Sequence, residues 1–318
     1  MAIGKPTIRK VHVTTPMQEI CQVLREDGVV VIEDYAPVDF IDALNEEAYP
    51  VFEKVRQTGN PKYPIKGGMK DFRSSNTDVI IGLAGKVPNA STKLMQHPVW
   101  HGIMEHFLVK ETWDWLAGEK ISRKGSYWLN ACSGYRVRPG AETQYLHRDH
   151  MLTNCQREIG IDTSPMGIAG FVAGTNVTAR NGGTNIIPGS HLWPLDREPK
   201  REEAAIAELK KGDGAFWLTT VFHSAGANSC EPGEPDAERM MYGFFGSQDT
   251  LRQADVQVLS VPPHIALKMP EKVLRLLGFL PGETGAGKLG GKLIMDNWEP
   301  LAGKYTPVSE YTWDIASH

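Results

Sequence analysis

The segment QYLHRDH, residues 144–150, gathers side chains that can ionise or bind a metal, shortly after a Pro-Gly pair. In an extended strand successive side chains point to opposite faces, so His147 and Asp149 share one face. A neutral imidazole and a carboxylate are two members of the His/His/carboxylate set that leaves positions open on Fe(II). An N-terminal helix cap or a surface pair is the alternative interpretation of so short a motif.

A third ligand must be a histidine from another part of the chain. His223 is the best candidate, because it follows the hydrophobic run WLTTVF and precedes the small residues SAGA. A sheet can bring the end of such a strand beside a distant segment, and small residues leave room there. On the same alternation, Gln144, Arg148 and His150 point away from the metal.

Helical patterns flank a strand-rich middle of the chain. Apolar residues recur every three or four positions in the flanking segments, and Phe107, Trp113 and Trp115 are expected in the core. From residue 126 onward, short aromatic and β-branched segments alternate with Gly, Pro, Asn and Asp, which is typical of a sandwich or jelly roll. Helices are predicted at 14–28, 38–55, 97–117, 197–213 and 270–280, and strands at 29–34, 126–137, 144–150, 168–177, 182–191, 213–226 and 239–248.

No linker divides the chain, so we expect one domain over residues 1–318 despite a length that permits two. Its parts are a mainly helical segment (1–125), a jelly-roll core (126–255) and a C-terminal helix and loop (256–318). The glycine-rich segment 282–291 fits nucleotide-binding patterns on paper. Leu289 follows its lysine where a phosphate-binding loop needs Ser or Thr, so we interpret the segment as a loop.

Composition excludes several classes of function. The net charge is −4 with a pI near 6.2 and no long basic run, which argues against nucleic acid or an anionic membrane as partner. Four widely separated cysteines indicate reduced thiols rather than a disulfide framework. No signal peptide or long apolar run is found. We therefore expect a soluble cytoplasmic protein that acts on a small molecule.

Five segments occur in an order typical of a known family: GSYWLNACSG, QYLHRDH, ARNGGTNIIPGSHLW, KKGDGAFWLTTVFHSAGAN and ERMMYGFF. Over most of its length the chain resembles the phytanoyl-CoA dioxygenase family of Fe(II)- and 2-oxoglutarate-dependent oxygenases. It is most similar to the fungal natural-product branch, which includes meroterpenoid oxygenases. The resemblance implies a mainly β fold with flanking helices and a double-stranded β-helix (jelly roll, cupin-like) core. It also implies a homodimer.

The resemblance also assigns roles to residues. His147, Asp149 and His223 match the iron ligands, and Arg239 matches the arginine that binds the far carboxylate of 2-oxoglutarate, for which a guanidinium fork is suited. Gln144 matches a further contact, although strict alternation would turn it away, so we expect a bulge or a strand end there. The remaining expected contacts are Thr184 and Arg73 for 2-oxoglutarate, and Asn130, Met151, Leu152 and Asn154 for the substrate.

The chemistry implied is oxidation of an unactivated C–H bond of a bulky apolar natural product, such as a meroterpenoid or an alkaloid. O2 and 2-oxoglutarate are consumed, and succinate and CO2 are released. The outcome is a hydroxylation, desaturation, rearrangement or endoperoxide, and Asp149 argues against halogenation because related halogenases have a small residue there. Two alternatives stay open: a zinc enzyme using the same three ligands without redox chemistry, and a non-catalytic jelly-roll partner subunit. Arg239 and Thr184 favour the oxygenase, since a zinc hydrolase needs no carboxylate clamp.

Overall fold

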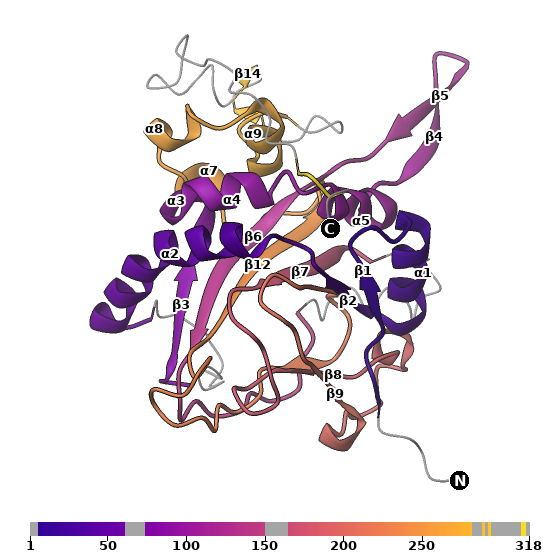
Figure 1. Cartoon of the computed structure of the whole chain (residues 1–318). Helices are drawn as coiled ribbons and strands as arrows, with labels where there is room; N and C mark the ends of the chain where they lie inside the picture. Colours follow the sequence, from indigo (N-terminus) through magenta and orange to yellow (C-terminus); the bar gives the residue numbers. More distant parts are fainter. Residues whose placement is uncertain are drawn as a thin grey trace.

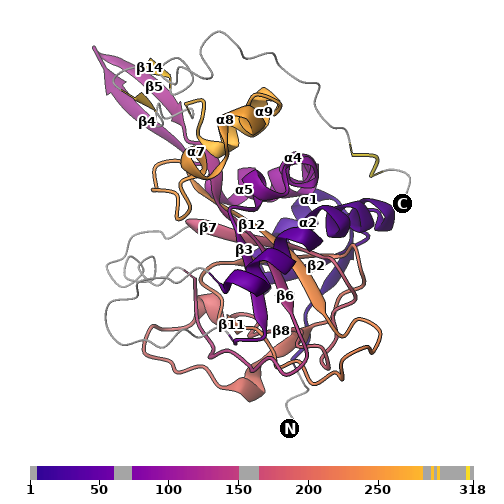
Figure 2. The ribbon, with the colours of Figure 1, turned by 90° about the vertical axis from the view of Figure 1, so that its left-hand side faces the viewer.

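A large β-sheet runs through the molecule, with helices over one face and a small second sheet on the other side (Figure 1). The computed structural model describes residues 6–60, 74–149, 165–281, 288–289, 292–293 and 313–315. The view turned by 90° keeps the helices and the small sheet on opposite sides of the large sheet (Figure 2). This arrangement confirms the predicted mainly β fold with flanking helices and a jelly-roll core.

The large sheet has seven strands, and all of its neighbouring pairs are antiparallel except for one parallel pair at the edge. Its strands are, in order across the sheet, β1 (Lys10–His12), β2 (Val29–Glu33), β10 (Gly214–Leu218), β7 (Gly167–Ala173), β12 (Arg239–Gln248), β6 (Tyr127–Val137) and β3 (Thr77–Ile81). Strands β1, β2 and β3 lie before residue 126 in the chain, so the N-terminal part helps to build this sheet. The predicted division of the domain stays a prediction.

Three further sheets are small. The three-stranded one is antiparallel and has the order β11 (His223–Ser224), β8 (Thr184–Ile186) and β9 (Ala205–Ala207). Two separate ribbons pair β4 (Glu111–Leu116) with β5 (Glu119–Lys124), and β13 (Lys288–Leu289) with β14 (Lys292–Leu293). The rest of the glycine-rich segment 282–291 lies outside the described residues.

The helices predicted at 14–28, 38–55 and 270–280 are confirmed as α1 (Met17–Asp27), α2 (Val38–Thr58) and α9 (Glu271–Leu277). Helix α1 ends at Gly28, whose φ of 74° is a left-handed conformation that glycine adopts readily. None of the helices in the described ranges is long and apolar enough to cross a membrane. The other helical segments are α3 (Leu83–Lys86), α4 (Pro88–Leu94), α5 (Pro98–Leu108), α7 (Gln257–Ser260), α8 (Pro263–Ala266) and the 3-10 turns η1 (Ser190–Leu192) and η2 (Arg201–Glu203).

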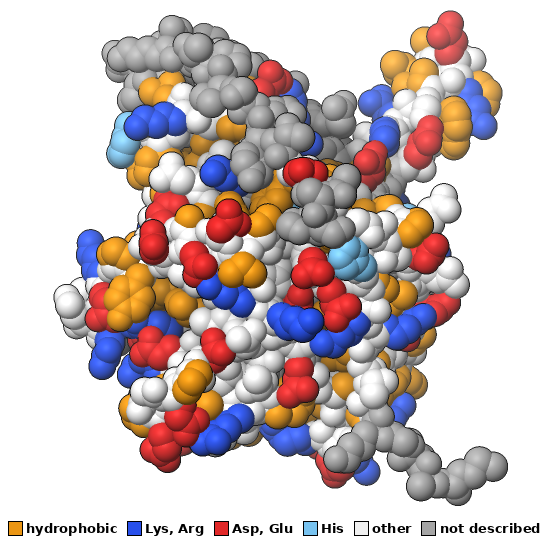
Figure 3. Space-filling view, viewed as in Figure 1, with side chains coloured by type: hydrophobic (Ala, Val, Ile, Leu, Met, Phe, Trp, Pro, Cys, Tyr) orange, Lys and Arg blue, Asp and Glu red, His pale blue; other side chains and the backbone are white. Residues whose placement is uncertain are grey.

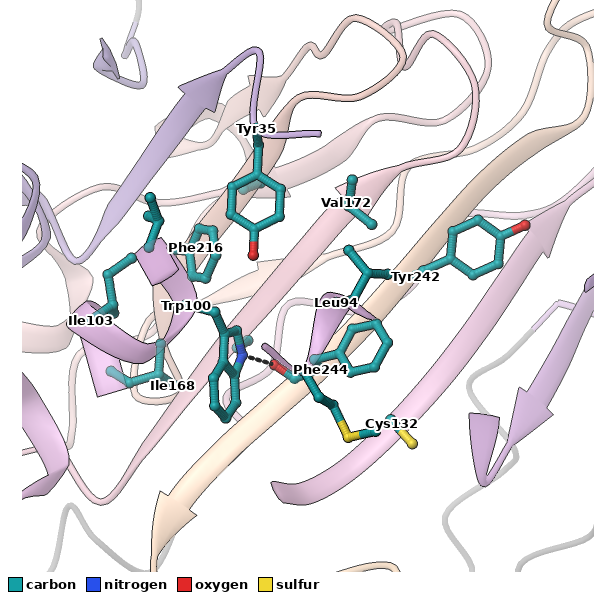
Figure 4. Packing of buried hydrophobic residues seen from close by; sticks show 14 of the residues in the cluster. Tyr35, Leu94, Trp100, Ile103, Cys132, Ile168, Val172, Phe216, Tyr242 and Phe244 are labelled. Atoms are coloured by element: carbon teal, nitrogen blue, oxygen red, sulfur yellow. Dashed lines mark hydrogen bonds between the residues drawn. The ribbon is translucent and has the colours of Figure 1, made fainter. Parts of the chain in front are cut away.

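The main core lies between the large sheet and the helices (Figure 4). Trp100 of α5 lies over the sheet, and its indole N–H donates a hydrogen bond of 3.2 Å to the carbonyl of Phe244 in β12. Phe216 packs beside it over Gly170, where a Cβ atom would lie 2.6 Å from the Phe216 ring. The glycine therefore lets two large aromatic rings approach the sheet closely.

The helix predicted over 97–117 is wrong in its second half. Helix α5 ends at Leu108, and the chain continues as β4, which pairs with β5 around a turn at Gly118. Trp113 and Trp115 are 59% and 70% exposed, so they do not belong to the core, whereas Phe107 does. Apolar and polar residues alternate in TWDWL, as in a two-stranded ribbon with two different faces. Here this two-residue period predicts the structure correctly, and the three-to-four-residue spacing of a helix does not. The ribbon projects from the body with apolar side chains on its surface (Figure 3).

The helix predicted over 197–213 is also wrong. This segment forms η2 and then β9, in which Ala205 and Ala207 are buried and Ile206 is exposed. The side chain of Glu203 accepts a hydrogen bond from the backbone of Lys200, which satisfies a short turn rather than a long helix. Pairing of β9 with β8 overrides the helical propensity of the charged residues.

Arg136 of β6 joins α2, β3 and the large sheet through buried ion pairs. Its side chain is fully buried, and its guanidinium lies 2.8 Å from a carboxylate oxygen of Asp78 and 2.6 Å from one of Glu53. Burial opposes the charge of Arg136, but the hydrogen bonds to Glu53 and Asp78 outweigh it and raise the pKa. The network fixes β3 and α2 at the edge of the sheet, where β3 forms a wall of the cavity described below.

Replacing Arg136 by methionine should lower the free energy of unfolding by about 3 kcal/mol, because the buried carboxylate of Asp78 and the half-buried one of Glu53 lose the cation between them, and Asp78 keeps only Arg138. Chemical denaturation of the purified variant measures this loss. Arg180→Met is the matched control, since Arg180 pairs with Glu234 at the surface and should cost less than about 1 kcal/mol. Equal losses in the two variants would contradict a structural role for the Arg136 network.

Candidate metal centre and cosubstrate pocket

His147 and His223 are held together by their own backbones. The amide N–H of each residue donates to the carbonyl of the other at 2.9 Å, which forms an isolated antiparallel bridge. His223 also pairs with Ile186 of β8, so the small sheet supports both histidines. The ring centroids are 4.5 Å apart. The third ligand expected from the sequence therefore lies next to the first.

Each imidazole is oriented by a hydrogen bond on the nitrogen that faces away from the site. Nδ1 of His147 lies 2.9 Å from the carbonyl oxygen of Tyr145, and Nδ1 of His223 lies 3.1 Å from that of Val221. A carbonyl can only accept, so both Nδ1 atoms carry the proton and both Nε2 atoms keep a lone pair. This is the tautomer that a metal-binding histidine requires through Nε2.

Asp149 completes the cluster from the same segment as His147. Its amide N–H donates to the carbonyl of Thr219 at 3.0 Å. Its Oδ1 atom lies 3.8 Å from Nε2 of His147 and 3.6 Å from Nε2 of His223. These separations are shorter than two metal–ligand bonds of about 2.1 Å each, so one ion can contact all three atoms. The three residues are the one group in the described part of the chain with such spacing.

The charge state of His147 suits a cation. Burial lowers the pKa of His147, and the neighbouring His223 lowers it further. A low pKa keeps the imidazole neutral, and neutrality is required for a nitrogen that donates its lone pair. Asp149 then supplies the negative charge of the cluster.

The prediction of a regular strand is wrong for residues 144–149, which form no strand except for the bridge at His147. His150 lies outside the described residues. His147 and Asp149 nevertheless face the same site. Arg148 does face away, and it is buried, with its guanidinium over the Phe222 ring and one N–H donated to the carbonyl of Ser190 at 2.8 Å. Because the segment is irregular, strict alternation does not apply to Gln144, which lines the same cavity as the histidines.

A cavity of about 250 Å³ extends from the three candidate ligands between the two sheets. Apolar and aromatic side chains cover its walls. Strand β6 contributes every second residue, and β3 does the same, as expected from the two-residue period of a strand. The lining residues are Ser74, Thr77, Val79, Ile81, Ser133, Tyr135, Val137, Glu142, Gln144, His147, Asp149, Phe171, Thr184, Trp217, His223, Ala225, Gly226, Arg239, Met241 and Phe245.

Stacked rings form the cavity wall next to the candidate ligands. Phe171 stacks on Trp217 with centroids 4.8 Å apart, and Phe245 meets Phe171 edge-on at 5.3 Å. Trp217 in turn lies 5.2 Å from the ring of His223. A Cβ atom at Gly243 would be 2.7 Å from the Phe171 ring, so the missing side chain makes room for this stack.

Arg239, the first residue of β12, is a buried cation that forms no ion pair with the residues that the structure describes. It is 4% exposed and lines the cavity. Its Nε and Nη1 atoms have no hydrogen-bond partner among the residues that the structure describes. Burial lowers the pKa of Arg239 to about 10, which still leaves the group charged at neutral pH. An unpaired guanidinium that faces a cavity fits a carboxylate ligand, which accepts two parallel hydrogen bonds.

The other residues singled out in the sequence have different positions. Thr184 and Gln144 line the cavity with Arg239. Asn130 is buried in β6, where its side-chain oxygen accepts a hydrogen bond of 2.8 Å from the amide of Ala254, and it is not among the lining residues. Arg73, Met151, Leu152 and Asn154 lie outside the described residues.

Several lining residues were not singled out in the sequence. Phe171, Trp217 and Phe245 lie in strands that were predicted, but their common face was not assigned. Alternation along β6 gives Ser133, Tyr135 and Val137 once the inward face is known. That face becomes known only when the sheet is assembled.

A family model described as phytanoyl-CoA dioxygenase (PhyH) matches residues 24–231. The chain belongs to this family. It is 31% identical over 297 residues to the dioxygenase swnH1 of Arthroderma benhamiae, with 92% of this chain and 91% of that protein covered. It is 30% identical over 303 residues to the dioxygenase swnH1 of Metarhizium robertsii, with 94% and 92% covered. The PhyH-family chain described here is thus an enzyme of the dioxygenase class.

A solved structure has a similar fold. The crystal structure of the non-heme alpha ketoglutarate dependent carbocyclase SnoK from nogalamycin biosynthesis aligns with a TM-score of 0.51 at 18% identity. The alignment covers 73% of this chain and 84% of SnoK. At this identity the likeness establishes a common fold, which agrees with the predicted jelly roll.

Replacing Arg239 by methionine should leave the free energy of unfolding of the metal-free protein unchanged or raise it by about 1 kcal/mol. The reason is that an unpaired buried charge costs stability, and methionine has a similar volume without it. Chemical denaturation measures the change, with Arg136→Met as the matched buried-arginine control. A loss as large as that of Arg136→Met would mean that Arg239 has a structural partner.

Proposed function

We propose that this protein is an Fe(II)- and 2-oxoglutarate-dependent dioxygenase that oxidises a C–H bond of a bulky, mostly apolar natural product. The observation that carries the proposal is the unpaired buried guanidinium of Arg239 in the same cavity as His147, Asp149 and His223. A metal site alone fits many reactions. A metal site with a buried carboxylate receptor fits a reaction whose cosubstrate is an anion.

In this proposal, Nε2 of His147, Nε2 of His223 and the carboxylate of Asp149 hold Fe(II). Three protein ligands on one side of the metal leave the remaining positions open. Both imidazoles are fixed by backbone carbonyls, so they need no reorientation when the metal enters. The neutral histidines and one carboxylate leave a positive charge on the site, which attracts the anionic cosubstrate.

Arg239 receives the far carboxylate of 2-oxoglutarate, and Thr184 and Gln144 contact the same molecule. The guanidinium neutralises the carboxylate in a place with little water, where the interaction is stronger than at the surface. Binding supplies an acceptor to a guanidinium whose Nε and Nη1 atoms have none among the described residues. Arg73 stays a predicted second contact.

With iron bound, O2 and 2-oxoglutarate supply an oxidation in which one oxygen atom enters succinate, CO2 leaves, and the second oxidises the substrate. The protein's part is to place the C–H bond and to keep water out. Phe171, Trp217 and Phe245 provide a rigid apolar wall beside the site for both tasks. Hydroxylation, desaturation, rearrangement and endoperoxide formation differ in which substrate atom that wall holds nearest the metal.

The substrate class follows from the cavity wall. Apart from the candidate metal ligands and the predicted cosubstrate contacts, most of its side chains are aliphatic or aromatic, and the polar ones are Ser74, Thr77, Ser133 and the carboxylate of Glu142. Such a surface binds an apolar skeleton and orients it by a small number of polar contacts. The fungal relatives named as dioxygenases and the role of SnoK in nogalamycin biosynthesis support a natural product, such as a meroterpenoid or an alkaloid. Met151, Leu152 and Asn154 stay predicted contacts.

Two other proposals explain less. A zinc enzyme without redox chemistry has no use for the unpaired Arg239. A non-catalytic partner subunit has no need to retain three oriented ligands. Homodimerisation and a cytoplasmic location stay predictions from the family resemblance and the sequence.

The test is succinate release. Protein reconstituted without oxygen is given Fe(II) and 2-oxoglutarate, then O2, and succinate is quantified, with Zn²⁺ in a parallel sample. We expect succinate with iron only, and background levels from His147→Ala and Asp149→Ala, because each removes one ligand. Both variants should keep the far-UV circular dichroism of the parent. His264→Ala removes an exposed histidine of α8 and should leave turnover unchanged.

Binding of 2-oxoglutarate to the same samples makes a negative result informative. Binding without succinate would mean that turnover waits for the true substrate. Neither binding nor succinate would reject the proposal, as would succinate release that persists in both ligand variants.

A further inference from the structure

Arg201 of η2 holds the segment that carries Gln144 by two hydrogen bonds. Its Nη1 atom donates to the hydroxyl of Thr143 at 2.8 Å, and its Nη2 atom donates to the carbonyl of Gln144 at 2.9 Å. Arg201 does not line the cavity and makes no ion pair within the described ranges. Its neighbour Glu203 pairs with Arg197 instead, at 2.6 Å. The guanidinium of Arg201 thus donates both hydrogen bonds to the segment that precedes His147, the first candidate iron ligand.

The same segment is tied on its other side to Ala225, two residues after His223. The hydroxyl of Thr143 and the amide N–H of Gln144 both donate to the carbonyl of Ala225 at 3.0 Å. The amide N–H of Ala225 donates back to Oε1 of Gln144 at 2.9 Å. Because its Oε1 atom is engaged, Gln144 has its NH2 group left to donate into the cavity that it lines.

We propose that Arg201 is a positioning residue that fixes the side chain of Gln144 as a hydrogen-bond donor to the cosubstrate. The inference rests on the proposed function, in which Gln144 contacts 2-oxoglutarate. The Nη1 and Nη2 atoms of one rigid guanidinium match the two acceptors at Thr143 and Gln144. A lysine has a single nitrogen atom and cannot reach both acceptors with the same geometry. With residues 143 and 144 clamped between Arg201 and Ala225, the NH2 group of Gln144 has one orientation, so less entropy is lost when the cosubstrate binds.

Arg201 and Gln144 come from two different connections of the chain. Arg201 lies in the connection from β8 to β9, whereas Gln144 lies between β6 and the ligand Asp149. Arg201 is exposed, and its two hydrogen bonds go to the segment of Gln144. Loss of Arg201 should therefore loosen one cosubstrate contact without disturbing the packing that holds the fold.

The experiment compares 2-oxoglutarate affinity in a double-mutant cycle. Isothermal titration calorimetry of the Fe(II)-loaded protein without oxygen gives the dissociation constant for the parent, Arg201→Ala, Gln144→Ala and the double variant. We expect Arg201→Ala to weaken binding about fivefold, the effect of one badly placed hydrogen bond. The double variant should bind no more weakly than Gln144→Ala, because the two residues act through one contact.

Two further variants and two further measurements separate positioning from general damage. Arg201→Lys should recover part of the affinity, since it keeps one donor. Arg197→Ala, in the same connection, should leave affinity unchanged. Melting temperature and Fe(II) affinity should match the parent in every Arg201 variant.

The outcomes distinguish this inference from the proposed function. If Gln144→Ala weakens binding and Arg201→Ala does not, the positioning role is wrong and the oxygenase proposal stands. Additive losses in the double variant would also overturn the positioning role. If neither Gln144→Ala nor Arg239→Met weakens binding, the assigned cosubstrate pocket itself is wrong.

Discussion

The two-way backbone hydrogen bond between His147 and His223 is the constraint on which the site depends. It joins two segments that are far apart in the chain and brings their imidazoles to a centroid distance of 4.5 Å. Asp149 follows two residues later and is anchored to Thr219, so its carboxylate points to the same place. The small sheet continues this pairing through β8, where Thr184 lies. One local bridge therefore sets the positions of the candidate metal ligands and of a predicted cosubstrate contact together.

Two buried arginines illustrate how the molecule separates stability from function. Arg136 is surrounded by carboxylates and ties the edge strand and α2 to the sheet. Arg239 is equally buried, but Nε and Nη1 have no protein acceptor in the described part of the chain. A protein accepts the cost of an unpaired buried charge where a ligand later neutralises it. The contrast supports the proposal that Arg239 binds a ligand without reference to any relative.

The cavity wall connects the core to the site through residues that have no side chain. Gly170 lets Phe216 and Trp100 approach one face of the large sheet, and Gly243 leaves room for Phe171 on the face that lines the cavity. The same central strands therefore carry a dense core on one face and a hollow on the other. Phe171 and Trp217 form a stacked aromatic pair. Such a pair is rigid, so it keeps the hollow open beside the candidate metal ligands.

The sequence by itself determined which side chains were candidates and the class of fold: the spacing of His147 and Asp149, the choice of His223, the jelly-roll core and the amphipathic end helices are all local patterns. It failed where local patterns compete with pairing, as at the predicted helices 97–117 and 197–213, because β4 and β9 are stabilised by partners outside the window that defines a helical period. Tertiary structure alone decided that Gln144 lines the cavity, that Asn130 does not, and that Nε and Nη1 of Arg239 have no acceptor among the described residues. Those properties depend on which atoms from distant segments come within hydrogen-bond reach, and residue spacing along a chain contains no such distances.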